Sequence, residues 1–162
     1  MDKIICNSII EKYMNASVKK ILAPFLFLTV VLGASTAALA QCNGFTKKKC
    51  IPLLAPFIHN GQLNSASFMP GENAELLMSF YSGQEYRLLI SGQEVLGNIQ
   101  FKVMDSDRKL LYDNKEHGNV KYWDFNVKST QQLIVEVIVP EQKVDNNLTQ
   151  SGCVAVLVGF KK

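Results

Sequence analysis

The stretch Leu133-Ile134-Val135-Glu136-Val137-Ile138-Val139 decides the fold class of this chain. Valine and isoleucine are β-branched, and such residues favour an extended backbone. The stretch is followed by Pro140, which has no N–H to donate to the next rung of a sheet. These seven residues therefore predict a central, buried β-strand.

Glu136 is the one charged residue in this strand. Because side chains alternate between the two faces of a strand, Glu136 shares its face with Ile134 and Ile138. A fully buried carboxylate would need a basic partner, for which Arg87 and Lys102 are the candidates. We predict instead that the face carrying Glu136 is partly open.

Seven further segments have the composition of strands, and each is bounded by turn-forming residues. They are residues 65–69, 74–81, 86–91, 98–104, 109–112, 122–127 and 154–160. No helical pattern is long enough to cover a parallel sheet. About eight short strands therefore predict an all-β domain, an antiparallel β-sandwich or jelly roll.

The first forty residues have the features of a secretory signal. Lys19 and Lys20 precede an apolar run over residues 21–32, and Ala38-Leu39-Ala40 is an A-x-A cleavage site. Met14 begins a more ordinary signal than Met1 does and is the start we favour. The alternative is that this segment stays uncleaved and anchors the chain in the membrane. If the segment is cleaved, we expect the chain to contact the membrane only before cleavage.

The signal divides the chain into three parts: a signal peptide over residues 1–40, an N-terminal arm over 41–64 and a β-sandwich domain over 65–162. The mature chain keeps 13 Lys/Arg against 12 Asp/Glu, a net charge of +1. Such a balance lacks the basic stripe that nucleic-acid binding requires. We expect an exported product, located in the periplasm, at the cell surface or outside the cell.

Three cysteines remain after cleavage, and export makes a disulfide favourable. Cys42 and Cys50 are the natural pair because they close a short loop. Cys153 lies in an apolar strand pattern and is expected to be a buried free thiol, although a bond from Cys153 to either of the others stays open.

Alternation within two strands predicts a binding face. In residues 122–127 the larger apolar side chains, including Trp123, point inward, which leaves Tyr122, Asp124 and Asn126 on the outer face. If residues 98–104 belong to the same sheet, Lys102 joins them. Such a surface suits a protein or carbohydrate partner, since tyrosine rings pack on both.

Cofactor and catalytic signals are weak. Asp105, Asp107 and Asp113 are the residues that could bind calcium through loop carboxylates, but aspartates at such positions ordinarily form turns. His59 and His117 stand in no metal-ligand or nucleophile motif. We predict no cofactor and no catalytic residue, with a small secreted hydrolase as the alternative.

Four segments together resemble small secreted bacterial proteins of uncharacterised function. They are residues 81–87 (YSGQEYR), 101–105 (FKVMD), 123–125 (WDF) and 152–155 (GCVA). In strand layout, residues 71–160 are also similar to the jelly-roll domains appended to secreted peptidases. The first resemblance implies no known activity, and the second implies a binding role.

The sequence thus predicts an exported, non-catalytic binding or structural module of the bacterial envelope. A further alternative is an accessory subunit that binds a partner protein through the N-terminal arm, residues 41–64.

Overall fold

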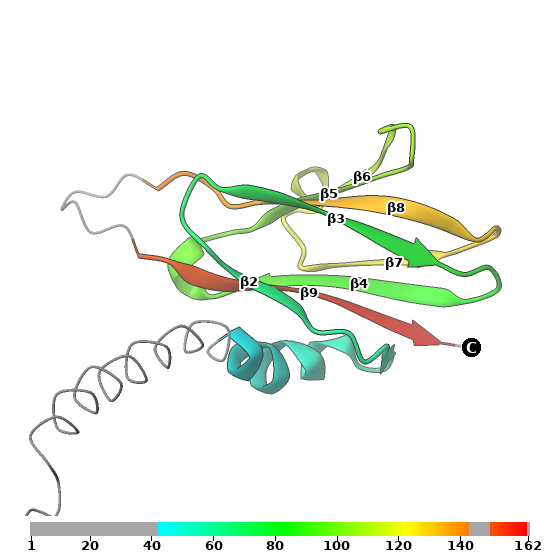
Figure 1. Cartoon of the computed structure of the whole chain (residues 1–162), viewed down its shortest axis with the longest axis horizontal. Helices are drawn as coiled ribbons and strands as arrows, with labels where there is room; N and C mark the ends of the chain where they lie inside the picture. Colours follow the sequence, from blue (N-terminus) through cyan, green and yellow to red (C-terminus); the bar gives the residue numbers. More distant parts are fainter. Residues whose placement is uncertain (1–41, 143–149, 162) are drawn as a thin grey trace, which may run out of the picture. The chain divides into compact units, whose positions relative to one another are not determined.

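The computed structural model describes residues 42–142 and 150–161, and the predicted signal segment lies outside them. Within that part of the chain, nine strands form two antiparallel sheets that pack on each other (Figure 1). None of its helices is long and apolar enough to cross a bilayer. The predicted all-β sandwich is confirmed.

The two sheets differ in size. The first sheet has five strands: β1 (Ile58–His59), β2 (Asn64–Phe68), β4 (Glu85–Gly92), β7 (Tyr122–Asn126) and β9 (Gly152–Lys161). In this sheet β9 pairs with β1 and β2 on one side and with β4 on the other, and β7 lies beyond β4. The second sheet has four strands in the order β3 (Asn73–Phe80), β8 (Gln131–Ile138), β5 (Gln100–Met104) and β6 (Leu110–Asp113).

All eight predicted strand segments correspond to strands, with ends that differ by one or two residues. The segment that decided the fold class becomes β8, which pairs with β3 on one side and β5 on the other. The prediction missed β1, because a strand of two residues has no detectable alternation.

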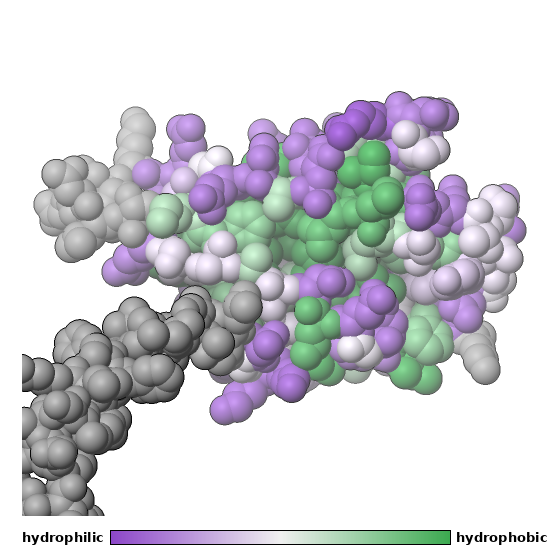
Figure 2. Space-filling view, in the orientation of Figure 1, coloured by the Kyte–Doolittle hydropathy of each residue, from purple (hydrophilic) through white to green (hydrophobic). Residues whose placement is uncertain are grey.

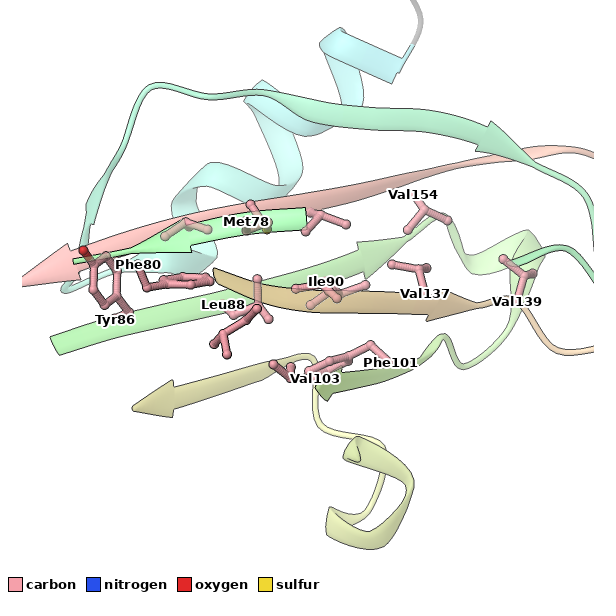
Figure 3. Close-up of a cluster of buried hydrophobic side chains, with 14 of the residues drawn as sticks. Met78, Phe80, Tyr86, Leu88, Ile90, Phe101, Val103, Val137, Val139 and Val154 are labelled. Atoms are coloured by element: carbon pink, nitrogen blue, oxygen red, sulfur yellow. The ribbon is translucent and has the colours of Figure 1, made fainter. Parts of the chain in front are cut away.

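The core lies between the sheets and is filled by alternate residues of facing strands. Leu88 and Ile90 come from β4 in the first sheet, while Phe101 and Val103 come from β5 in the second (Figure 3). All four are almost fully buried. Burying a side chain of this size contributes roughly 1.5–3 kcal/mol, so this layer supplies much of the stability.

The outer face of β8 is half-buried, as predicted for Glu136. Leu133, Val135 and Val137 point into the core, whereas Ile134 and Glu136 are intermediate in exposure. The Glu136 carboxylate also lies 3.7 Å from the Lys102 ammonium, and 21% of its side chain remains exposed. The open face and the basic partner therefore occur together.

The first half of the N-terminal arm is helical. Helical turns follow one another from residue 42 to residue 54: residues 42–45, then η2 (Thr46–Cys50) and then η3 (Ile51–Leu54). The buried members are four residues apart, and this spacing is the amphipathic signal that we overlooked; they are Cys42, Thr46, Cys50 and Leu54. Pro52 stands in the first turn of η3, where a missing N–H costs nothing.

The predicted disulfide between Cys42 and Cys50 is wrong. Cys42 is bonded to Cys153, with their Cα atoms 5.3 Å apart, and Cys50 is a buried free cysteine. Cys50 lies eight positions after Cys42 in a helical segment, about 12 Å along its axis, whereas a disulfide needs Cα atoms within about 7 Å. The bond fastens the helical arm to the start of β9.

Two short helices complete the described structure: η4 (Glu94–Leu96) before β5 and η5 (Asn114–His117) between β6 and β7.

The arm lies close against β9 because Gly159 has no side chain. A Cβ at this position would come within 2.7 Å of the Cβ of Phe57.

Candidate functional site

A sandwich of two open sheets has two flanks where the layers meet. On one flank β6 of the second sheet meets β7 of the first, and on the other β3 meets β2 and β9. We call these the closed flank and the open flank, because side chains fill the first and leave a groove along the second.

The closed flank is filled by an aromatic ladder, a run of stacked rings from η5, β6, β7 and β4. Its members, in order, are His117, Tyr112, Trp123, Phe125 and Tyr86. Successive ring centroids are 4.7, 5.0, 4.2 and 5.9 Å apart. Burial raises the pKa of the Tyr112 hydroxyl. The ladder confirms that Trp123 packs inward.

Asn114 fastens the same flank through polar contacts. Its side chain is almost fully buried, and its Oδ1 accepts a hydrogen bond from the backbone N–H of Phe101 at 2.8 Å. Its Nδ2 donates to the backbone carbonyls of Ile99 and Val120. A single side chain thus satisfies three backbone groups and joins β5 to the segment before β7.

The open flank contains a groove with a volume of about 810 Å³, which we call the β2–β3 groove. It runs between β3 and the segment 60–64, with β9 and β4 at its base. A second hollow of about 360 Å³ shares Leu63, Asn64 and Leu76 with it and continues along β3. Figure 2 shows a hydrophobic surface in this part of the molecule, with hydrophilic side chains along its margins.

No charged side chain lines the larger part of the β2–β3 groove. Its polar groups are amides and hydroxyls, from Asn60, Gln62, Asn64, Ser79, Gln84 and Tyr81. Its apolar surface comes from Leu63, Leu76, Leu77, Met78, Val158 and Phe160. Leu77 and Tyr81 are 64% and 63% exposed, so both offer accessible surface in the groove lining. This combination suits an uncharged ligand with both apolar and hydrogen-bonding groups.

The sequence-predicted face is only partly assembled. Tyr122, Asp124 and Asn126 do lie together on the exposed face of β7. Lys102 does not join them, because β5 belongs to the second sheet and Lys102 contacts Glu136 there. The inclusion of Lys102 required both strands to share a sheet, and this condition is not met. Strand order cannot be read from alternation alone.

Arg87 of β4 organises this exposed face and was missed as a site residue. Its guanidinium makes two 2.7 Å hydrogen bonds to the Asp124 carboxylate and donates to the backbone carbonyl of Ala55. It also lies 4.6 Å from the ring centre of Phe57 and 4.3 Å from that of Tyr122. The hydrogen bonds to the Asp124 carboxylate raise the pKa of Arg87 above its ordinary value.

These contacts hold the N-terminal arm against the sheet. Leu54 and Phe57 are buried within the domain, whereas Leu53 and Ile58 remain exposed. One face of the Tyr122 ring is covered by Arg87, and 45% of the residue is exposed. Arg87 therefore holds the Tyr122 ring in place, and the exposed part of the ring remains accessible to a partner.

The calcium candidates form turns in this structure. The Asp105 carboxylate accepts hydrogen bonds from the N–H groups of Asp107 and Lys109. The Asp113 carboxylate accepts from Gln100 and from the N–H of Lys115. No group of three or more His, Cys, Asp or Glu that could hold a metal ion occurs in residues 42–142 and 150–161.

The histidines that could have served a hydrolase make structural contacts. The His59 Nε2 lies 3.1 Å from the backbone carbonyl of Gln62, at the turn that begins the groove wall. His117 stacks on Tyr112 at the exposed end of the aromatic ladder.

No family model matches the chain, and no curated protein matches it. One solved structure to which the chain shows similarity is PliG from Aeromonas hydrophila, a periplasmic lysozyme inhibitor of g-type lysozyme. The two share 13% sequence identity with a TM-score of 0.45, over 65% of this chain and 89% of PliG. At these values the assignment of a function depends on the geometry described above.

Proposed function

We propose that this protein is an exported, non-catalytic binding module of the bacterial envelope that holds a protein partner in the β2–β3 groove. The observation that carries the proposal is the groove itself. It is large and uncharged, combines apolar side chains with amides and hydroxyls, and lies on one flank of a sandwich whose other flank is filled. The A-x-A signal and the Cys42–Cys153 disulfide support export, because disulfides persist in oxidising compartments.

A protein partner fits the groove better than a small ion or an acidic polymer. Charged ligands would be desolvated there without a compensating charge. The amides of Gln62, Asn64 and Gln84 can donate to and accept from a peptide backbone, while Leu76 and Met78 offer apolar contact.

Site-specific crosslinking tests this proposal in the envelope. A photo-crosslinking amino acid replaces Leu77 in the groove, or Leu110 on β6 as the matched control, since both are exposed leucines on edge strands. We expect a covalent adduct with one defined protein from position 77 and none from position 110. The purified partner should then bind the Leu77→Lys variant roughly 10-fold more weakly or worse. Equal adducts from both positions, or none from either, would refute the groove as the site.

Purified g-type lysozyme can be included as one defined probe in the same binding assay. Binding that Leu77→Lys weakens and Leu110→Lys does not would identify the class of partner. An unaffected or absent interaction would exclude lysozyme as the occupant of the groove.

The exposed face of β7 is a second candidate for a partner surface, favoured by the rigid setting of Tyr122. The alanine variant of Tyr122 distinguishes the two surfaces. A loss of partner or carbohydrate binding in Tyr122→Ala, with Leu77→Lys unaffected, would move the site to that face.

A further inference from the structure

We propose that the partner enters the β2–β3 groove as an extended, uncharged polypeptide segment that adds a strand to the free edge of β3. This inference rests on the proposed function, since it takes the groove to be the binding site. It specifies the mode of binding, in which backbone hydrogen bonds supply affinity and alternate side chains supply specificity.

β3 is the longest edge strand in the described structure. Its eight residues pair with β8 in an uninterrupted register, from Asn73 to Phe80. The other edges are shorter: two residues in β1, five in β2, four in β6 and five in β7. β6 is further disrupted by a register shift opposite Val103 and Met104.

β3 lacks the features by which exposed edges usually avoid pairing. It contains no proline, no lysine and no bulge. Its one charge, Glu75, is bonded to both terminal nitrogens of Arg108 at 2.9 and 2.8 Å. Near its centre Leu77 is 64% exposed. Such an edge is a template for another strand.

The backbone of β3 has groups available for that strand. Outside its ladder with β8, residues 73–80 make no backbone hydrogen bond to any other part of the described chain. In an edge strand, alternate N–H and C=O groups point away from the paired neighbour, so one side of β3 offers a row of donors and acceptors.

The groove determines the chemistry of the incoming segment. A strand on the free edge of β3 would place alternate side chains over the apolar base, near Val158 and Phe160, and would direct the others outward. The uncharged lining disfavours Asp, Glu, Lys or Arg at the inward positions, because burial of an unpaired charge is costly. Eight residues span about 26 Å, so we expect a segment of roughly that length.

Selection from a peptide library supplies a defined probe. Random peptides of about 12 residues, long enough to cover β3, are selected on the immobilised domain and counter-selected on the Leu77→Lys variant. We expect enriched peptides to alternate apolar and uncharged polar residues. Each is then compared with a version that is N-methylated at alternate residues, which removes backbone donors and leaves the side chains intact.

For strand addition, N-methylation on the side facing β3 should weaken binding roughly 10-fold to 100-fold, as expected for the loss of two or three hydrogen bonds. N-methylation at the other residues should have little effect. Amide hydrogen exchange should slow in residues 73–80 when the peptide binds. The Leu110→Lys variant, which adds the same charge to β6, should bind like the unmodified protein.

The outcomes separate this inference from the proposed function. Peptides that depend on Leu77 but tolerate every N-methylation would refute strand addition and leave the groove as the site. Failure to select any Leu77-dependent peptide, with no adduct from position 77, would refute the proposed function. The domain could instead self-associate through β3 and become monomeric in the Leu77→Lys variant. This result would show that a second copy occupies the edge, and it would also overturn this inference.

Discussion

The two flanks of the sandwich differ in how side chains fill the space between the sheets. On the closed flank, five stacked rings and the buried Asn114 fill the space between β6 and β7. On the open flank, β3 and β2 stay apart and leave a groove of about 810 Å³. The filled flank contributes rigidity, and the groove exposes apolar area that folding alone would be expected to bury.

The two flanks separate the residues that stabilise the fold from those that we propose to bind the partner. Residues of the aromatic ladder contact many neighbours, so their loss should mainly lower the free energy of unfolding. Residues on the edge of β3, such as Leu77, have few neighbours, so their loss should mainly lower affinity. Four variants test this contrast, beginning with the one expected to be most destabilising.

Trp123→Ala should have the largest effect on stability. It removes the ring that stacks on both Tyr112 and Phe125, and truncation of a packed aromatic residue costs roughly 3 kcal/mol for a site of intermediate exposure. Leu77→Ala on the open flank should change the free energy of unfolding by less than about 0.5 kcal/mol. Urea denaturation measures both. Equal losses in the two variants would show that the flanks do not differ in this way.

Asn114→Ala should cost about 2 kcal/mol. It leaves the N–H of Phe101 and the carbonyls of Ile99 and Val120 without their side-chain partner. Asn64→Ala, on the groove wall, is the matched control and should be nearly neutral. The same denaturation experiment applies, with hydrogen exchange at the Phe101 amide as a local readout. An unchanged exchange rate there would contradict the role given to Asn114.

The sequence was sufficient for the architecture because strands carry local signals. Period-two alternation and turn residues located eight of the nine strands, and they placed Trp123 on an inward face. Tertiary pairing was harder. Nothing local tells that β5 and β7 belong to different sheets, so Lys102 was grouped with Tyr122.

The remaining errors have a similar cause. The spacing of Cys42, Thr46, Cys50 and Leu54 was a visible helical signal, and recognising it would have excluded the Cys42–Cys50 bond. The β2–β3 groove had no such signal, because it depends on which strand edges remain unpaired. Arg87 was considered only as a partner for Glu136, and its contacts with Asp124 and Phe57 depend on β4 lying beside β7 and under the arm.

Tyr86→Phe tests the residue that belongs to both flanks. The Tyr86 ring ends the aromatic ladder, while the residue also lines the groove, and its hydroxyl oxygen accepts a hydrogen bond from the Tyr81 N–H at 3.1 Å. We expect a loss of about 1 kcal/mol in the free energy of unfolding. Partner binding should also weaken, since Tyr81 loses its anchor. Weaker binding without any loss of stability would assign Tyr86 to the groove alone.

Glu75→Gln should have the smallest effect, and its pH dependence identifies the cause. Hydrogen bonding from Arg108 lowers the Glu75 pKa below its ordinary value of 4.5 in the folded protein. The ion pair therefore stabilises the fold at pH above 4.5 and loses this contribution as the pH falls through the folded-state pKa. Both side chains are exposed, so the gain is small and sensitive to salt. The difference between the native protein and Glu75→Gln should be present at neutral pH and vanish in acid. A difference that persists in acid would mean that Glu75 acts on the β3 edge through contacts other than its charge.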